Sequence, residues 1–161
     1  MSCHDGDYAS PVVRHSLPNE VLLGEVERML NQGRDVVLMP KGRSMLPFIR
    51  GNVDKVVLSP PKELKVGDIV LARFGGRFVL HRIIGINGDQ VTLMGDGNLQ
   101  GTEQGTTQEV AGVVSDIITP DGRHHKPTRG WLWRQLLPVR KYLLKIYRKW
   151  NKMKSTFSEQ S

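Results

Sequence analysis

Residues 69–94 of the chain read IVLARFGGRFVLHRIIGINGDQVTLM. Apolar runs rich in β-branched residues alternate here with two short turn signals, Gly75-Gly76 and Asn87-Gly88. Gly-Gly and Asn-Gly pairs between apolar runs indicate tight hairpin turns, because these residues accept the positive φ that such turns require. The stretch therefore predicts consecutive antiparallel strands at 69–74, 78–84 and 91–94.

The same kind of apolar run occurs on both sides of this meander, at 36–39, 55–58 and 110–118. Turn-forming residues such as Pro60-Pro61 separate the runs. Many short strands at this spacing are typical of twisted, barrel-like antiparallel sheets. We therefore predict a mainly β domain, in which residues 101–107 form a connecting turn.

The segments outside the strands predict two helices. A short amphipathic helix is expected between a capping pattern at Ser16 and a stop at Gly33. A chain of 161 residues fits one domain with extensions. We predict a disordered leader over 1–15, the β domain with its N-terminal helix over 16–120, and a loop followed by a basic amphipathic helical tail over 121–161.

The composition bounds the class of protein. Hydrophobic residues make up 39% of the chain and charged residues 24%, as in ordinary globular domains. A single cysteine, Cys3, excludes an intrachain disulfide and a cysteine-based metal site. No run approaches the ~18–20 apolar residues that span a bilayer, and no apolar signal-peptide segment is found. We therefore predict a cytoplasmic protein without a transmembrane helix.

The formal net charge of +7 is concentrated in the tail after Arg129. Trp and Tyr alternate there with Lys and Arg, a pattern typical of a helix that lies on an anionic membrane. Two interpretations remain open. Residues 129–154 contact the inner face of the membrane, or the helix docks its apolar stripe on the β domain or on a partner. Nucleic acid is disfavoured, because no base-reading motif accompanies the charge.

Three separated residues supply the parts of a catalytic site. Ser44 lies in a Gly-rich turn that can expose its hydroxyl, but a serine needs a base to act as a nucleophile. His81, in a strand-like run, is the candidate base. Asp96 or Glu103 is the candidate acid that orients the imidazole, and the pattern alone leaves both open. The sequence predicts no cofactor, and the pair His124-His125 lacks the further ligands of a metal site.

The chain resembles a known family at four successive motifs. GRSMLP at 42–47 is similar to the serine box of type I signal peptidases, and LKVGDIV at 64–70 to their Val-Gly-Asp strand. VLHRII at 79–84 resembles the box that carries the general base, and MGDGN at 94–98 resembles the Gly-Asp-Asn box. Asn52 stands where the family's Arg-Gly-Asp has its acid. The resemblance implies a signal peptidase-like serine peptidase of the S24/S26 type, with the LexA/signal peptidase fold.

Histidine at the base position, where bacterial relatives have lysine, resembles the Ser-His branch of endoplasmic-reticulum and archaeal signal peptidases. The resemblance implies an endopeptidase that cleaves an extended peptide, with Ser44 as nucleophile, His81 as base and Asp96 (or Glu103) as acid. Met45 and Pro47 form an apolar flank expected to bind substrate. Two alternatives remain: a non-catalytic peptide-binding or regulatory module that keeps the fold, and a LexA-like self-cleaving protein. The sequence does not predict an oligomeric state.

Overall fold

The computed structural model describes residues 19–98, 100–130, 135–136 and 139–158. The predicted leader over 1–15 therefore lies outside the described residues. The elements, in chain order, are helix α1 (Asn19–Asn31), strands β1 (Val36–Leu38), β2 (Lys55–Ser59), β3 (Ile69–Phe74), β4 (Arg77–Asn87), β5 (Gln90–Met94) and β6 (Glu103–Thr106), a 3-10 turn (Thr107–Glu109), strands β7 (Val110–Ile118) and β8 (His124–His125), and helix α3 (Arg140–Ser158).

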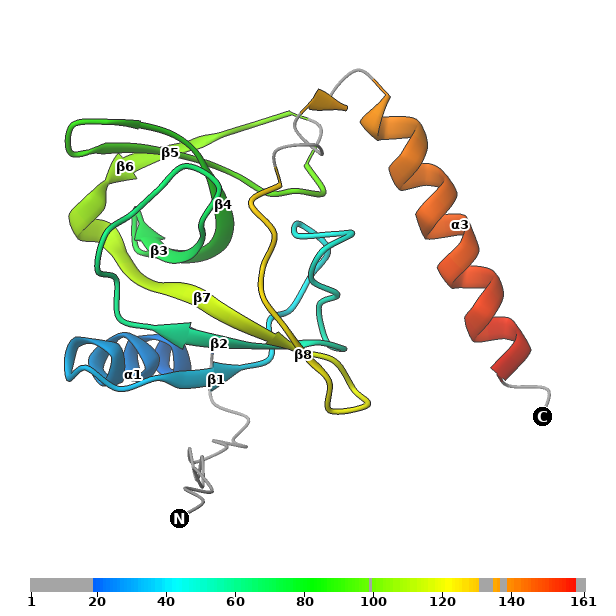
Figure 1. The fold of residues 1–161 in the computed structure, drawn as a ribbon, viewed down its shortest axis with the longest axis horizontal. Helices are drawn as coiled ribbons and strands as arrows, with labels where there is room; N and C mark the ends of the chain where they lie inside the picture. The colour runs from blue at the N-terminus through cyan, green and yellow to red at the C-terminus, as the bar shows by residue number, and fades with distance from the viewer. Residues whose placement is uncertain (1–18, 99, 131–134, 137–138, 159–161) are drawn as a thin grey trace, which may run out of the picture.

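One antiparallel sheet contains all the described strands. Its order is β1-β2-β7-β3-β4-β5-β6, and β8 pairs with β7. The sheet curls on itself, with α1 beside β1 and below β2 and β7, and with α3 standing at the opposite side (Figure 1). The prediction of a mainly β, barrel-like fold with an N-terminal and a C-terminal helix is confirmed.

The curl buries both faces of the central strand β3. Ile69 and Leu71 pack into a core that α1 closes, whereas Val70 and Ala72 pack into a second core inside the curl. Successive side chains of a strand point to opposite faces. The first four residues of β3 are all apolar and buried, so they fill both cores; a strand that alternated apolar and polar residues would fill only one.

The strand β4 is divided between the same two cores. Phe78 and Leu80 pack against the core that α1 closes, whereas Ile83 belongs to the inner core and Val79 packs against it. The register shifts between Ile83 and Gly85, where β4 pairs with β5. Such a bulge bends a strand and increases its twist, which helps the sheet to curl. β4 thus carries the VLHRII motif through the middle of the molecule.

Candidate functional site

Ser44 lies in a compact turn that follows β1. Gly42 has a φ of +88°, a left-handed backbone that glycine adopts without steric cost. The turn lies against the segment that leads into β2, so closely that a Cβ on Gly51 would come within 2.0 Å of the Gly42 carbonyl oxygen. Glycine at position 51 is therefore required for this approach, which fixes the shape of the turn around the half-buried Ser44.

The MGDGN motif packs against the other side of the Ser44 turn. The Gly97 amide donates a hydrogen bond of 2.7 Å to the Ser44 carbonyl oxygen. A Cβ on Gly95 would lie 2.5 Å from that oxygen, and a Cβ on Gly97 would lie 2.5 Å from the Arg43 carbonyl oxygen. Both positions require glycine, because the backbone of the MGDGN motif lies directly against the backbone of the serine turn and leaves no space for a side chain. Their motif serves as a support for the serine turn.

Ser44 and His81 line one cavity of about 170 Å³. Its walls are the serine turn on one side and the Phe78–His81 part of β4 on the other, with Met45 and Ile49 adding apolar surface. Within the described residues, no hydrogen bond joins the Ser44 hydroxyl to the His81 ring. Catalytic hydrogen bonds are often long in unliganded enzymes and shorten when substrate binds.

The carboxylate of Glu103 contacts the imidazole of His81. Oε2 of Glu103 lies in hydrogen-bonding contact with Nδ1 of His81, whose side chain is 8% exposed against 32% for Glu103. Glu103 belongs to β6 and stands opposite Leu93 on β5. A carboxylate accepts the Nδ1 proton, and this leaves Nε2 as the ring nitrogen with a free lone pair. His81 is thereby fixed in the tautomer that a general base requires.

Asp96 contacts Arg82 instead of His81. Arg82 Nε donates to Asp96 Oδ1 at 2.8 Å and Arg82 Nη2 donates to Oδ2 at 2.6 Å. Both side chains are almost fully buried, at 1% and 3% exposure. The prediction that Asp96 orients His81 is corrected: neighbouring residues on a strand point to opposite faces, and Asp96 lies on the side of Arg82.

Arg82 also holds a distant part of the chain. Its Nη1 donates to the Gly67 carbonyl oxygen at 2.7 Å and to the Thr128 carbonyl oxygen at 2.5 Å. Gly130 passes so close that a Cβ there would lie 2.7 Å from Arg82 Nε. The Arg82–Asp96 pair therefore joins β4, the loop of the MGDGN motif and the segment that leads toward α3.

The first residue of α3 reaches the same carboxylate. Arg140 Nη2 lies 3.9 Å from Asp96 Oδ1, and both side chains are buried. Burial lowers the pKa of Arg140, and the nearby Arg82 lowers it further, although Asp96 acts in the opposite direction. Burial prevails because the ion pair is long and Asp96 already accepts two hydrogen bonds from Arg82.

A family model described as Peptidase S24-like matches residues 14–114. The chain belongs to this family. A comparison with curated proteins found no match. The S24-like match covers the serine turn, β4, the MGDGN motif and β6, and it bears out the expected S24/S26-type fold. It leaves the Ser-His assignment as a proposal.

The expected substrate-binding residues occupy different places in the S24-like domain. Met45 lines the cavity shared by Ser44 and His81, and its side chain is also part of the core that α1 closes. Pro47 is half-buried and is not among the residues that line this cavity. The apolar lining of this cavity therefore includes Met45, Ile49 and Phe78 but not Pro47.

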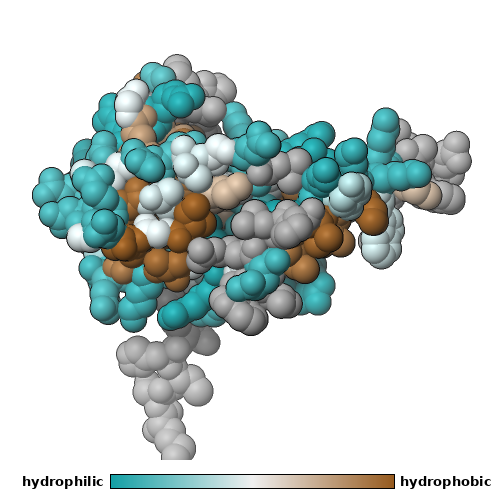
Figure 2. Space-filling model, turned by 90° about the horizontal axis from the view of Figure 1, so that it is seen from above, coloured by the Kyte–Doolittle hydropathy of each residue, from teal (hydrophilic) through white to brown (hydrophobic). Residues whose placement is uncertain are grey.

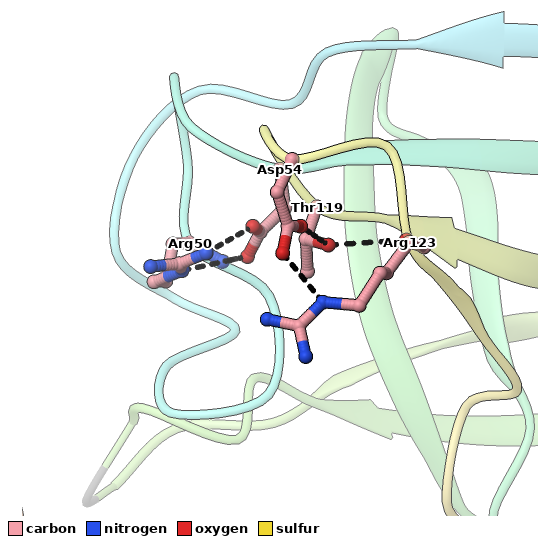
Figure 3. A network of polar contacts seen from close by, with 5 residues as sticks. Arg50, Asp54, Thr119 and Arg123 are labelled. Atoms are coloured by element: carbon pink, nitrogen blue, oxygen red, sulfur yellow. Dashed lines mark hydrogen bonds and ion pairs between the residues drawn. The ribbon is translucent and has the colours of Figure 1, made fainter.

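Asp54 is a residue of the S24-like domain that the sequence did not single out. Its Oδ2 accepts hydrogen bonds from the backbone N of Arg50 at 2.8 Å and from Arg50 Nε at 3.0 Å, and its Oδ1 accepts one from Nη2 at 2.7 Å. The pair lies beside the turn of Thr119 and Arg123 (Figure 3), and it raises the pKa of Arg50. Asn52, with a φ of 62°, makes the turn between the partners. The i, i+4 spacing of Arg50 and Asp54 is the signal that would have identified the pair.

The remaining sequence candidates lie away from the S24-like site. His124 Nδ1 contacts Asp116 Oδ2 at 2.5 Å on the exposed β8. Among the described residues, no group of three metal-ligating side chains forms a site. None of the helices that the structure describes combines the length and the apolar content needed to traverse a bilayer.

Proposed function

We propose that the chain is a serine endopeptidase that uses Ser44 as nucleophile and His81 as general base. The single observation that carries this proposal is the shared cavity: Ser44 and His81 line it together, and Glu103 stands behind the imidazole. A buried histidine whose Nδ1 is held by a carboxylate is suited to accept a proton at Nε2. Membership of the Peptidase S24-like family supports the same reaction class.

The reaction follows from these positions. When a peptide carbonyl enters the cavity, Ser44 Oγ attacks its carbon and the hydroxyl proton passes to His81 Nε2. The resulting oxyanion needs donors, and the Ser44 amide, which donates to no backbone carbonyl in the described part of the chain, is suited to this role. Nε2 then returns the proton to the leaving amine, and water hydrolyses the acyl-enzyme by the reverse proton path.

An extended peptide is the substrate that the surroundings favour. β1 is an edge of the sheet, and the chain continues from it into Pro40 and Lys41, which line the cavity. Edge strands bind extended peptides through their unpaired backbone groups. A peptide that adds to this edge is led toward Ser44.

The test is cleavage of a mixture of unstructured peptides, followed by mass spectrometry. We expect Ser44→Ala to abolish cleavage and to leave the thermal unfolding midpoint unchanged, because the Ser44 hydroxyl makes no hydrogen bond within the described residues. Ser115→Ala, which removes another half-buried hydroxyl, is the matched control and should cleave normally. Wild-type cleavage by Ser44→Ala would refute the assignment.

The structure also bears on self-cleavage. Ala111-Gly112 is the dipeptide that resembles a self-cleavage site under the LexA-like alternative. It is buried in β7 at the centre of the sheet, where Gly112 pairs with Leu71. A Cβ on Gly112 would lie 2.8 Å from the Leu30 side chain. Cleavage at this position would require β7 to leave the sheet, so we propose that the substrate is a separate peptide.

A further inference from the structure

Helix α3 presents three different faces. With about 3.6 residues per turn, Arg140, Leu144 and Tyr147 fall on one side, and this side meets the domain. Arg140 and Leu144 are 3% and 2% exposed. The buried contact that the structure describes therefore lies near the start of the helix, and the side chains of its other two faces are exposed.

An apolar stripe runs along a second face and is exposed. Its members are 38% to 62% exposed: Tyr142, Leu143, Ile146, Trp150 and Met153. A helix that packs on its own domain normally buries such a stripe. Within residues 140–153, the side of the helix that meets the domain is formed by Arg140 and Leu144, and the stripe is exposed.

A basic row lies along the third face, next to the apolar stripe. It consists of exposed lysines and one arginine: Lys141, Lys145, Arg148, Lys149 and Lys152. The sequence of α3 contains no acidic residue. Figure 2 shows apolar and charged residues side by side along this projecting part of the molecule.

The domain adds positive charge opposite the helix. A cavity of about 850 Å³ separates α3 from the serine turn. Arg43 and Arg50 line it from the domain, Arg148 and Lys149 line it from the helix, and none of the residues that line it is acidic. Arg50 is paired with Asp54, so the charge that this surface adds to the basic row comes chiefly from Arg43, which is exposed.

We propose that α3 binds the surface of an anionic membrane, with the apolar stripe at the boundary of headgroups and acyl chains and the basic row on the phosphates. In this arrangement the apolar stripe is removed from water and the basic row is neutralised by anionic headgroups. Trp150 and Tyr142 suit the boundary, since their rings combine an apolar body with a polar group. A nucleic acid would neutralise the basic row but would leave the apolar stripe in water. The proposal does not depend on peptidase activity.

The test is sedimentation of the full chain with vesicles of equimolar phosphatidylglycerol and phosphatidylcholine, compared with vesicles of phosphatidylcholine alone. We expect binding to the anionic vesicles that weakens as salt is added. Ile146→Asn/Trp150→Asn should lower the partition coefficient by about tenfold or more, because each change removes a large apolar side chain from the lipid. Lys141→Gln/Lys145→Gln should weaken binding to anionic vesicles only.

Matched controls separate a specific face from general surface effects. Val21→Asn/Val66→Asn removes two apolar side chains that are 57% and 41% exposed elsewhere on the molecule, and it should bind like the wild type. Circular dichroism should show unchanged thermal unfolding for every variant. Equal binding by Ile146→Asn/Trp150→Asn and by the wild type would overturn the proposal. The proposal would also be overturned if the wild-type protein did not bind anionic vesicles. This holds even if the same residues were then found to form a dimer contact or to bind a DNA duplex.

Discussion

Replacing Asp96 by Asn should destabilise the protein far more than it impairs chemistry. Asp96 neutralises Arg82, and both side chains are buried, at 3% and 1% exposure. Removing one partner of a buried ion pair leaves an uncompensated charge, which typically reduces the free energy of unfolding by about 3–5 kcal/mol. Arg140, buried 3.9 Å from Asp96, adds a second positive charge to the site and favours the upper part of that range.

The expected loss translates into a large change of the thermal midpoint. For a domain of this size, each kcal/mol shifts the midpoint by about 2–4 °C. Asp96→Asn should therefore unfold about 6–20 °C below the wild type, as measured by circular dichroism. Glu63→Gln, which alters an ion pair with Lys65 whose side chains are 82% and 51% exposed, is the control and should unfold near the wild-type temperature.

A comparison of Asp96→Asn with Glu103→Gln separates the structural acid from the acid that contacts the imidazole. Glu103 contacts His81 and is 32% exposed, so its replacement should affect the base more than the fold. Measured below the unfolding range of both variants, peptide cleavage should fall about a hundredfold or more in Glu103→Gln and much less in Asp96→Asn. The roles of the two acids would be refuted by the opposite result, in which Asp96→Asn unfolds at the wild-type temperature and Glu103→Gln shows the loss of stability expected for Asp96→Asn.

Two further outcomes follow from contacts near the site and at the surface. Gly97→Ala should lower the free energy of unfolding by about 1–3 kcal/mol and reduce cleavage, because the new Cβ would meet the Arg43 carbonyl oxygen. Gly24→Ala is the control: a Cβ there has nothing within 4 Å, so the change should stabilise α1. Chemical denaturation of both variants checks these expectations. Hydrogen bonds from Thr119 and Arg123 lower the pKa of Asp121 to about 2. The stabilisation that the Asp121 carboxylate provides is therefore present above the ordinary carboxyl pKa and is lost as the pH falls through about 2. A carboxyl NMR titration of Asp121 with an ordinary midpoint would contradict these hydrogen bonds.

The apolar runs and the hairpin signals were sufficient to predict six strands and the two helices. The strands β6 and β8 were missed, and residues 101–107 were interpreted as a turn. β6 is polar, Glu103 to Thr106, and lies at the sheet edge, where it pairs only with β5. A strand that contributes little to the core carries no apolar alternation, so its pattern resembles that of a loop.

The choice between Asp96 and Glu103 depended on the same missed strand. His81 and Arg82 are adjacent on β4, so only one of them can face Asp96, and the sequence does not tell which. The register places Arg82 opposite Met94, two residues before Asp96. Glu103 reaches His81 only because β6 pairs with β5 and sets Glu103 opposite Leu93. Without β6, its carboxylate had no predicted position.

The two adjacent residues of β4 therefore serve different parts of the molecule. His81 lines the cavity with Ser44 and contacts Glu103. Arg82 binds Asp96 in the motif that supports the Ser44 turn, and Asp96 also lies near Arg140 at the start of α3. One carboxylate thus anchors both the support of the serine turn and the helix that we propose to bind lipid. This buried cluster, together with the buried Leu144 one turn further along, places the start of α3 against the domain on the side of the Ser44 turn.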